Sequence, residues 1–165
     1  MTDRQRNIVA NAVSMGGLFV TAGLEPANVM TTHWGGLVQM WNREVFLLPV
    51  RKKRYTHELI EKNKCFVVNV PRENMNNVIS ACDHLSGKGI NKFEKLNLTP
   101  VKAKNIPSVS VAECGLVFEC KVIYATDMEK SKLDTIIARD MYINKEFHTL
   151  FFGEVINCYV QKKKV

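Results

Sequence analysis

The segments Asn28-Val-Met-Thr31-Thr32-His-Trp34 and Arg51-Lys-Lys-Arg54-Tyr55-Thr56 are the most informative part of this chain. The first reads as a strand whose hydroxyl and amide side chains offer hydrogen-bond donors and acceptors to a planar polar ligand. The second places arginine and threonine just ahead of a helix pattern, where such residues can bind a dianion. Together they predict a site for a polar ring that carries a phosphate.

Length and composition indicate one globular domain over residues 1–165. The chain is 46% apolar and 24% charged, which is ordinary for a protein with one hydrophobic core. Its longest apolar stretches, such as Val45–Val50 and Cys65–Val68, are much shorter than the roughly 20 residues that cross a bilayer. The polar N-terminus does not resemble a signal peptide. We therefore expect a cytoplasmic protein without a membrane partner.

The five cysteines, Cys65, Cys82, Cys114, Cys120 and Cys158, are odd in number and contain no Cys-x-x-Cys pair. This pattern argues against a secreted disulfide framework and against a zinc site. We expect reduced thiols that act as small buried hydrophobic residues.

The net charge of +7 is concentrated in two places, Arg51–Arg54 and Lys162–Lys164. No aromatic residues interleave with the C-terminal lysines, so a solvated tail is expected there and nucleic acid is not expected as a partner. The first cluster runs into a helix pattern, for which Thr56 is the predicted N-cap. The alternative for this cluster is an exposed cationic edge strand.

β-Branched and aromatic runs between Gly, Pro and Asn predict a mainly β protein with a β-barrel core and peripheral helices. The expected strands are Gly17–Ala22, Ala27–Trp34, Glu44–Val50, Cys65–Val70, Val109–Ala125 and Thr149–Ile156. The expected helices are Thr56–Lys64, Glu73–Cys82 and Lys132–Tyr142. The charged segment Asp127–Asp134 is expected to be a linker.

Several function classes lack their motifs. The element order is not an alternating βαβ pattern, and neither a Gly-x-Gly-x-x-Gly loop nor a P-loop is present. The serines lack a Gly-x-Ser-x-Gly frame, and the histidines lack metal-ligand spacing. His57 and His84 are expected at the surface or as capping groups. His148 precedes a strand, where its side chain can overhang a pocket.

Taken together, the polar segments resemble the flavin reductase and flavoredoxin family. The motifs that carry the resemblance are Asn28-x-Met30-Thr31-x-x-Trp34, Arg51-x-x-Arg54-Tyr55-Thr56, Phe66-x-Val-Asn69-Val-Pro71, Ser86-Gly87-Lys88 with Lys92-Phe93, Glu113-Cys114, Glu119-Cys120-Lys121, and His148 before Phe152-Gly153-Glu154-Val155. Their order and spacing match over almost the full chain. The resemblance implies an FMN-binding split β-barrel, a homodimer with the flavin near the subunit interface, and in many members reduction by a nicotinamide nucleotide.

The resemblance also implies roles for individual residues. The isoalloxazine ring would be lined by Asn28, Met30, Thr31 and Thr32, with Trp34 packed nearby. The phosphate would be held by Arg51, Arg54, Tyr55 and Thr56. The loop Ser86-Gly87-Lys88, together with Lys92, would close over the phosphate or the ribityl chain; the alternative for this loop is an ordinary turn.

His148 is the candidate contact for the nicotinamide, and its alternative role is a strand-end histidine with a backbone partner. Asp83 departs from the family pattern, in which a glycine is usual, and residues 1–14 lack the prolines that often precede the first strand. Two functions stay open. One is an enzyme that passes electrons from NADH or NADPH to FMN, and the other is an FMN electron carrier reduced by a partner protein. The short basic cluster suits the single phosphate of FMN better than FAD.

Overall fold

The computed structural model describes residues 1–144 and 146–162. Its strands are β1 (Leu18–Ala22), β2 (Asn28–Thr32), β3 (Gly36–Met40), β4 (Arg43–Arg51), β5 (Cys65–Val70), β6 (Pro100–Lys102), β7 (Val109–Val111), β8 (Leu116–Asp127) and β9 (His148–Val160). Its helices are α1 (Asp3–Met15), α2 (Tyr55–Asn63), α3 (Asn76–His84), α4 (Lys92–Lys95) and α5 (Thr135–Met141), with a 3-10 turn η1 (Lys130–Lys132).

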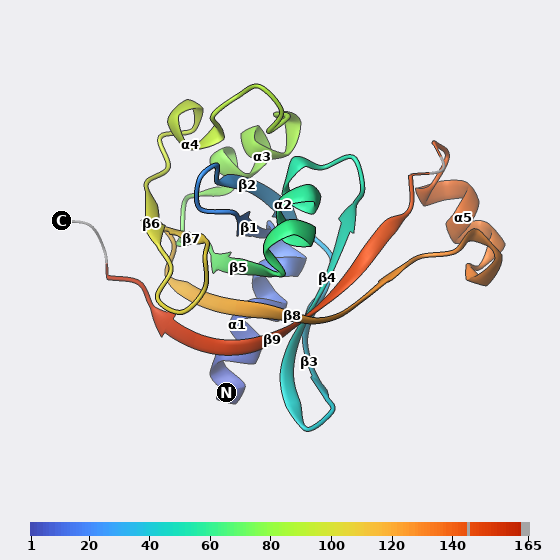
Figure 1. Ribbon diagram of the computed structural model, residues 1–165, viewed down its shortest axis with the longest axis horizontal. Helices are drawn as coiled ribbons and strands as arrows, with labels where there is room; N and C mark the ends of the chain where they lie inside the picture. The colour runs from blue at the N-terminus through green and yellow to red at the C-terminus, as the bar shows by residue number, and fades with distance from the viewer. Residues whose placement is uncertain (145, 163–165) are drawn as a thin grey trace.

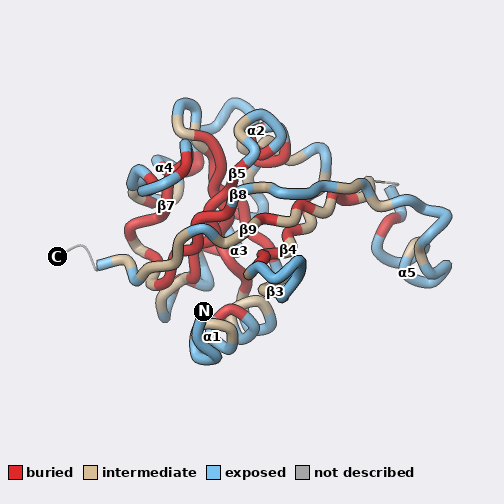
Figure 2. The backbone as a smooth tube through the Cα atoms, turned by 60° about the horizontal axis from the view of Figure 1, so that its bottom comes forward, coloured by how far each residue is buried: buried red, intermediate tan, exposed pale blue. Residues whose placement is uncertain are grey.

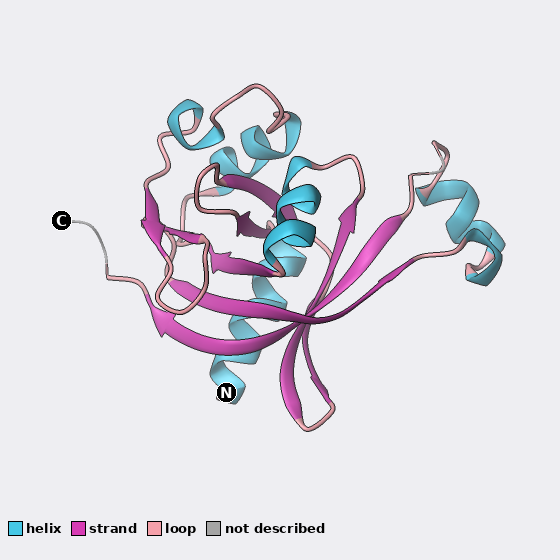
Figure 3. Ribbon diagram, in the orientation of Figure 1, coloured by secondary structure: helices cyan, strands magenta, loops and turns pink. Residues whose placement is uncertain are grey.

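Seven strands form one antiparallel sheet in the order β2-β1-β5-β8-β9-β4-β3, and β6 pairs with β7 in a second, small sheet. Figure 3 shows the helices around the outside of the strands, with α1 and α2 against the body of the sheet. The prediction of a mainly β protein with peripheral helices is confirmed. Strands β8 and β9 continue beyond the body and carry α5 at their far end (Figure 1). We call residues 128–147, between these two strands, the arm.

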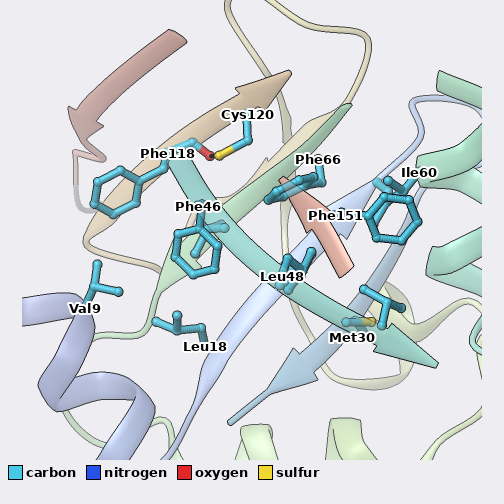
Figure 4. Packing of buried hydrophobic residues seen from close by; sticks show 14 of the residues in the cluster. Val9, Leu18, Met30, Phe46, Leu48, Ile60, Phe66, Phe118, Cys120 and Phe151 are labelled. Carbon is cyan, nitrogen blue, oxygen red and sulfur yellow. Dashed lines mark hydrogen bonds between the residues drawn. The ribbon is translucent and has the colours of Figure 1, made fainter. Parts of the chain in front are cut away.

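The main core lies between the curved sheet and the helices that cover it. Phe46, Phe66 and Phe151 converge there, and Val9 reaches the same cluster from α1 (Figure 4). Each such side chain contributes about 1.5–3 kcal/mol when it is fully buried. The buried segments run through the middle of the sheet, whereas the described residues of the arm and the outer side of α1 are largely exposed (Figure 2).

The structure differs from the expected elements in two main places. The expected strand Val109–Ala125 is divided into β7 and β8, because the chain turns between them at residues 112–115. Helix α1 is absent from the sequence-based predictions, although its N-terminus carries a capping box in which Thr2 and Gln5 bond reciprocally. Strands β3 and β6 and the short helix α4 are also absent from those predictions.

All five cysteines are free thiols, and four of them are buried, as predicted. In the described part of the chain, no helix combines the length and apolar character that crossing a bilayer would require. The end of the basic C-terminal run, residues 163–165, lies outside the described residues.

Candidate functional site

Two adjoining cavities lie where β2, the end of β4, the start of α2 and the start of β9 meet. The larger, about 340 Å³, is lined by Met30, Thr31, Thr32, His33, Trp34, Pro49, Val50, Arg51, Arg54, Asp83 and His148, and we call it the histidine cavity. The smaller, about 250 Å³, is lined by Asn28, Met30, Lys53, Arg54, Tyr55, Thr56, Asp83, His84, Leu85, Ser86, Gly87 and Lys92, and we call it the lysine cavity. Met30, Arg54 and Asp83 line both cavities. We therefore treat the two cavities as one site.

Strand pairing explains why residues far apart in the sequence meet here. In the antiparallel pair of β4 and β9, Arg51 lies directly opposite His148, so the basic end of β4 is placed beside the histidine. Among the described residues, strand β2 pairs with β1 alone, and it is buried over its full length because α2, α3 and α4 pack against it. The polar side chains of β2 are therefore enclosed between the sheet and these helices.

Asn28 and Thr56 form a buried pair at the lysine cavity. The Asn28 amide Nδ2 donates to Thr56 Oγ1 at 2.9 Å. The prediction of Thr56 as a helix N-cap is wrong, because the helix begins at Tyr55 and its N-cap is Arg54, which makes no side-chain cap bond. The Thr56 hydroxyl accepts from Asn28 instead and ties α2 to β2. Gly87 approaches this pair so closely that a Cβ there would lie 2.5 Å from Asn28 Oδ1.

Asp83 stands between the two cavities. Its carboxylate accepts a hydrogen bond from Thr31 Oγ1 at 3.2 Å and from Arg54 Nη2 at 3.1 Å. The sequence marks this aspartate only as a departure from the family pattern, and it predicts neither contact. Arg54 is therefore paired with Asp83 at the junction of the cavities. An anion with a higher charge than a carboxylate can compete with Asp83 for this guanidinium.

His148 lies at the edge of the histidine cavity between two aromatic rings. Its ring centroid is 4.9 Å from that of Trp34, and its Nδ1 lies 2.8 Å from the Tyr142 hydroxyl oxygen. Burial, followed by the positive charges of Arg51 and Arg54, lowers the pKa of His148 to about 4. The imidazole is therefore neutral near pH 7.

Lys92 is buried, with its ammonium directed at the last turn of α3. Its Nζ donates to the Cys82 carbonyl oxygen at 2.9 Å and lies 3.8 Å from the Cys82 sulfur. Burial lowers the pKa of Lys92 and raises the pKa of the Cys82 thiol. Lys92 therefore lines the lysine cavity as a cation that is already partly satisfied by the protein.

Thirteen of the fourteen predicted site residues line one or both of the two cavities. The exception is Lys88, which forms an ion pair with Glu58. It lines a separate, mostly apolar cavity of about 760 Å³ that adjoins the lysine cavity at Tyr55 and Gly87. The expected division into ring and phosphate groups is not reproduced, since Arg51 lies with Thr31 and Thr32 while Thr56 lies with Asn28. Contact of these residues with a flavin stays a prediction.

The prediction that His57 lies at the surface or acts as a capping group is wrong. The side chain is buried, and its Nε2 lies 2.8 Å from Thr149 Oγ1. The Thr149 hydroxyl donates in turn to Asp127 Oδ1 at 2.7 Å, so it accepts from an Nε2–H. Burial lowers the pKa of His57. The chain of contacts joins α2 to β9 and β8 and lies outside the two cavities.

His84 is exposed, as expected.

Two residues of the arm near the site, Tyr142 and Glu146, were not predicted from the sequence. Glu146 pairs with Lys53 and lies 3.8 Å from Arg51, so it partly neutralises the basic cluster from outside the site. The only sequence signal for either residue is its closeness to His148 in the chain. Closeness in the sequence does not show which contacts the two side chains make in the fold.

With this geometry established, comparison with known proteins identifies the family. Residues 11–165 match the sequence profile described as "Flavin reductase like domain". The chain belongs to the flavin reductase-like family. A protein of Archaeoglobus fulgidus described as uncharacterized is 31% identical over 139 residues, which cover 84% of this chain and 68% of that protein.

Two solved structures of the family's fold show how far the likeness extends. Flavoredoxin of Desulfovibrio vulgaris (Miyazaki F) has a TM-score of 0.71 at 22% identity, covering 89% of this chain and 70% of that one. An FMN-binding protein from Thermus thermophilus, solved with bound 1-cyclohex-2-enone, has a TM-score of 0.68 at 15% identity, covering 87% and 70%. The split β-barrel that the flavin reductase-like resemblance implies is thereby confirmed as the fold.

Proposed function

We propose that this flavin reductase-like protein binds FMN and is an oxidoreductase that transfers electrons from NADH or NADPH to the flavin and on to an acceptor. The observation that carries the proposal is the pair of adjoining cavities, which joins an aromatic end at Trp34 and His148 to a cationic, hydroxyl-rich end at Arg54 and Thr56. A flavin mononucleotide has the same two parts, a ring and a phosphate. The matched family and the FMN-binding relative from Thermus thermophilus agree with this ligand.

The charges of the cavities fit an anionic ligand. In the described part of the chain, four cationic side chains line them, Arg51, Lys53, Arg54 and Lys92, and Asp83 supplies the one carboxylate. A phosphate in reach of such groups gains charge-assisted hydrogen bonds worth about 1.5–3 kcal/mol each. The first turn of α2, which begins at Tyr55, adds the favourable end of a helix dipole. Arg54 is the residue that we expect to exchange Asp83 for the phosphate.

A bound flavin would supply the hydride acceptor, so the protein needs no nucleophile of its own. The roles of its residues are to bind and orient the flavin and to shield it from water. Trp34 and His148 form the aromatic wall of the histidine cavity, and Met30 lies between the two cavities. Neutral His148 offers a hydrogen bond without adding positive charge, which suits contact with the uncharged carboxamide of a nicotinamide.

The test is an anaerobic absorbance spectrum of the protein reconstituted with FMN, recorded before and after addition of NADH and then NADPH. We expect a flavin band that stays with the protein and bleaches with at least one nucleotide. Failure to retain any flavin would refute the cofactor. Retained flavin that neither nucleotide bleaches would refute direct reduction and favour an electron carrier reduced by a partner protein, as in the alternative reading of the family.

We also propose that the protein works as a homodimer. Helix α5 and the residues just after it expose a group of apolar side chains at the end of the arm, namely Ile136, Ile137, Met141 and Ile143. Exposed apolar surfaces of this kind often mark protein interfaces, and the homodimer that the family resemblance implies offers a second copy of the chain as the partner. Sedimentation analysis should give twice the monomer mass, and Ile136→Asp should shift the protein toward the monomer. A monomer at all concentrations would contradict this part of the proposal.

A further inference from the structure

Tyr142 contacts His148, the histidine to which the proposed function gives a role, and has no role of its own in that function so far. It follows α5 in the arm, and its side chain is buried. The hydroxyl oxygen has two neighbours within hydrogen-bond reach, His148 Nδ1 at 2.8 Å and Met128 Sδ at 3.2 Å. A phenol has one proton to donate, so only one of these contacts can be an O–H donation.

The acceptor strengths of His148 Nδ1 and Met128 Sδ decide which of them receives the Tyr142 hydrogen bond. An imidazole nitrogen without a proton is a good acceptor, whereas a thioether sulfur is a weak one. Donation to Nδ1 therefore gives the stronger hydrogen bond. Neutral imidazole carries one proton on one of its two nitrogens, so an Nδ1 that accepts from Tyr142 requires the proton of His148 to sit on Nε2.

The surroundings of His148 support this arrangement. Burial and the nearby guanidinium groups of Arg51 and Arg54 lower its pKa to about 4, so the ring is neutral at pH 7 and has a defined tautomer. Within residues 1–144 and 146–162, Nε2 has no hydrogen-bond partner, and it is not among the fully buried nitrogens that lack one. It is therefore open to a ligand at the histidine cavity, whose lining includes His148.

Packing holds the pair in place. The Phe147 ring stacks on Tyr142 with centroids 4.9 Å apart and planes 18° from parallel. The Tyr142 ring meets the His148 ring edge to face at 5.5 Å, and Trp34 covers His148 from another side at 4.9 Å. A ring enclosed in this way cannot turn over freely, so the choice of tautomer also sets which atom faces the cavity.

We propose that Tyr142 is a positioning residue: its hydroxyl donates to Nδ1 of His148 and thereby presents Nε2–H to the histidine cavity as a fixed hydrogen-bond donor. The group that this donor recognises is a carbonyl oxygen, and the carboxamide of a nicotinamide nucleotide provides one. The identity of that ligand rests on the proposed function, whereas the tautomer does not.

The tautomer is measured in the flavin-free protein by ¹⁵N NMR of the histidine rings at pH 7, with His148→Gln used to assign the His148 signals. We expect wild-type His148 to have a protonated Nε2 and an unprotonated Nδ1. Tyr142→Phe should lose this preference. Met128→Leu should keep it, since Leu is close in size to Met and the sulfur is not the main acceptor. Wild-type His148 with its proton on Nδ1 would overturn the proposal.

Kinetics then separate positioning from a merely structural role. Tyr142→Phe should raise the KM for the nicotinamide nucleotide about three- to tenfold, the loss expected when one neutral hydrogen bond is no longer oriented, with a smaller change in kcat. Tyr124→Phe is the matched control, because Tyr124 is an exposed tyrosine that lines neither cavity. An unchanged KM in Tyr142→Phe would overturn the carbonyl-donor role. A wild-type protein that bleaches with neither nucleotide would refute the reductase function and leave the NMR result to decide the tautomer.

Discussion

Replacement of Gly87 by alanine tests whether the lysine cavity holds the cofactor. A Cβ at this position would lie 2.5 Å from Asn28 Oδ1 and 2.6 Å from Nδ2, well inside the 3.4 Å at which ordinary contact begins. Asn28 cannot simply move away, because it is buried and donates to Thr56 Oγ1 at 2.9 Å. Either the loop shifts outward or the Asn28–Thr56 bond breaks. Both outcomes change the shape of the cavity.

Overpacking of this kind costs about 1–3 kcal/mol, which corresponds to about a 5- to 150-fold increase in the Kd for FMN if the cofactor uses this cavity. The assay is titration of the flavin-free protein with FMN, followed by flavin fluorescence. Gly89→Ala is the matched control, since a Cβ there meets no atom within 4 Å and Gly89 lines neither cavity of the site. Its positive φ of 81° predicts about 1 kcal/mol of lost stability, with FMN binding nearly unchanged. Wild-type affinity in a folded Gly87→Ala protein, or an equal loss in both variants, would refute the reasoning.

Three further predictions follow from individual side chains. Arg54→Ala should weaken FMN about 10- to 150-fold and leave riboflavin, which lacks the phosphate, nearly unaffected in the same titration; an equal loss for both would contradict a phosphate contact. His148 has its pKa lowered from 6.5 to about 4, so its contribution to stability is complete above pH 6.5 and is lost as the pH falls through about 4. Urea unfolding should show wild type losing about 2–3 kcal/mol more than His148→Gln between pH 7 and pH 4, and parallel losses would argue against the shift. Glu119→Ala should cost about 3 kcal/mol in unfolding free energy, because the buried carboxylate accepts from Lys104 N, Asn105 N and Asn105 Nδ2; a cost below 1 kcal/mol would contradict this.

Local sequence patterns predicted most elements near the site, because their information lies within a few residues. The polar strand at Asn28–Thr32 and the helix that follows Arg54 were both expected, and they differ from the structure by one or two residues at their ends. The capping box of Thr2 and Gln5 is a local signal for the start of α1 as well, although α1 was not predicted. Near Cys114 a run of β-forming residues concealed a turn, since propensity alone does not show where a strand changes sheet.

Contacts between distant segments were much less predictable. His57 has the polar character of a surface residue, and only its neighbours Thr149 and Asp127, which arrive from two other strands, explain its burial. From the sequence, Asp83 was distinguished only as an aspartate at a position where the family usually has glycine. Its contacts with Thr31 and Arg54 require β2, α2 and α3 to meet at one point.

The sequence by itself determined that this protein is mainly β, that it belongs with the flavin reductases, and which polar and basic residues form its candidate site. These properties depend on composition, on periodicity and on motifs whose spacing can be read along the chain. Only the tertiary structure decided that Arg51 lies opposite His148, that Lys88 is outside the two cavities, and that Tyr142 reaches Nδ1 of the histidine. The physical reason is that strand register and side-chain packing set such contacts, and both arise from the whole fold at once.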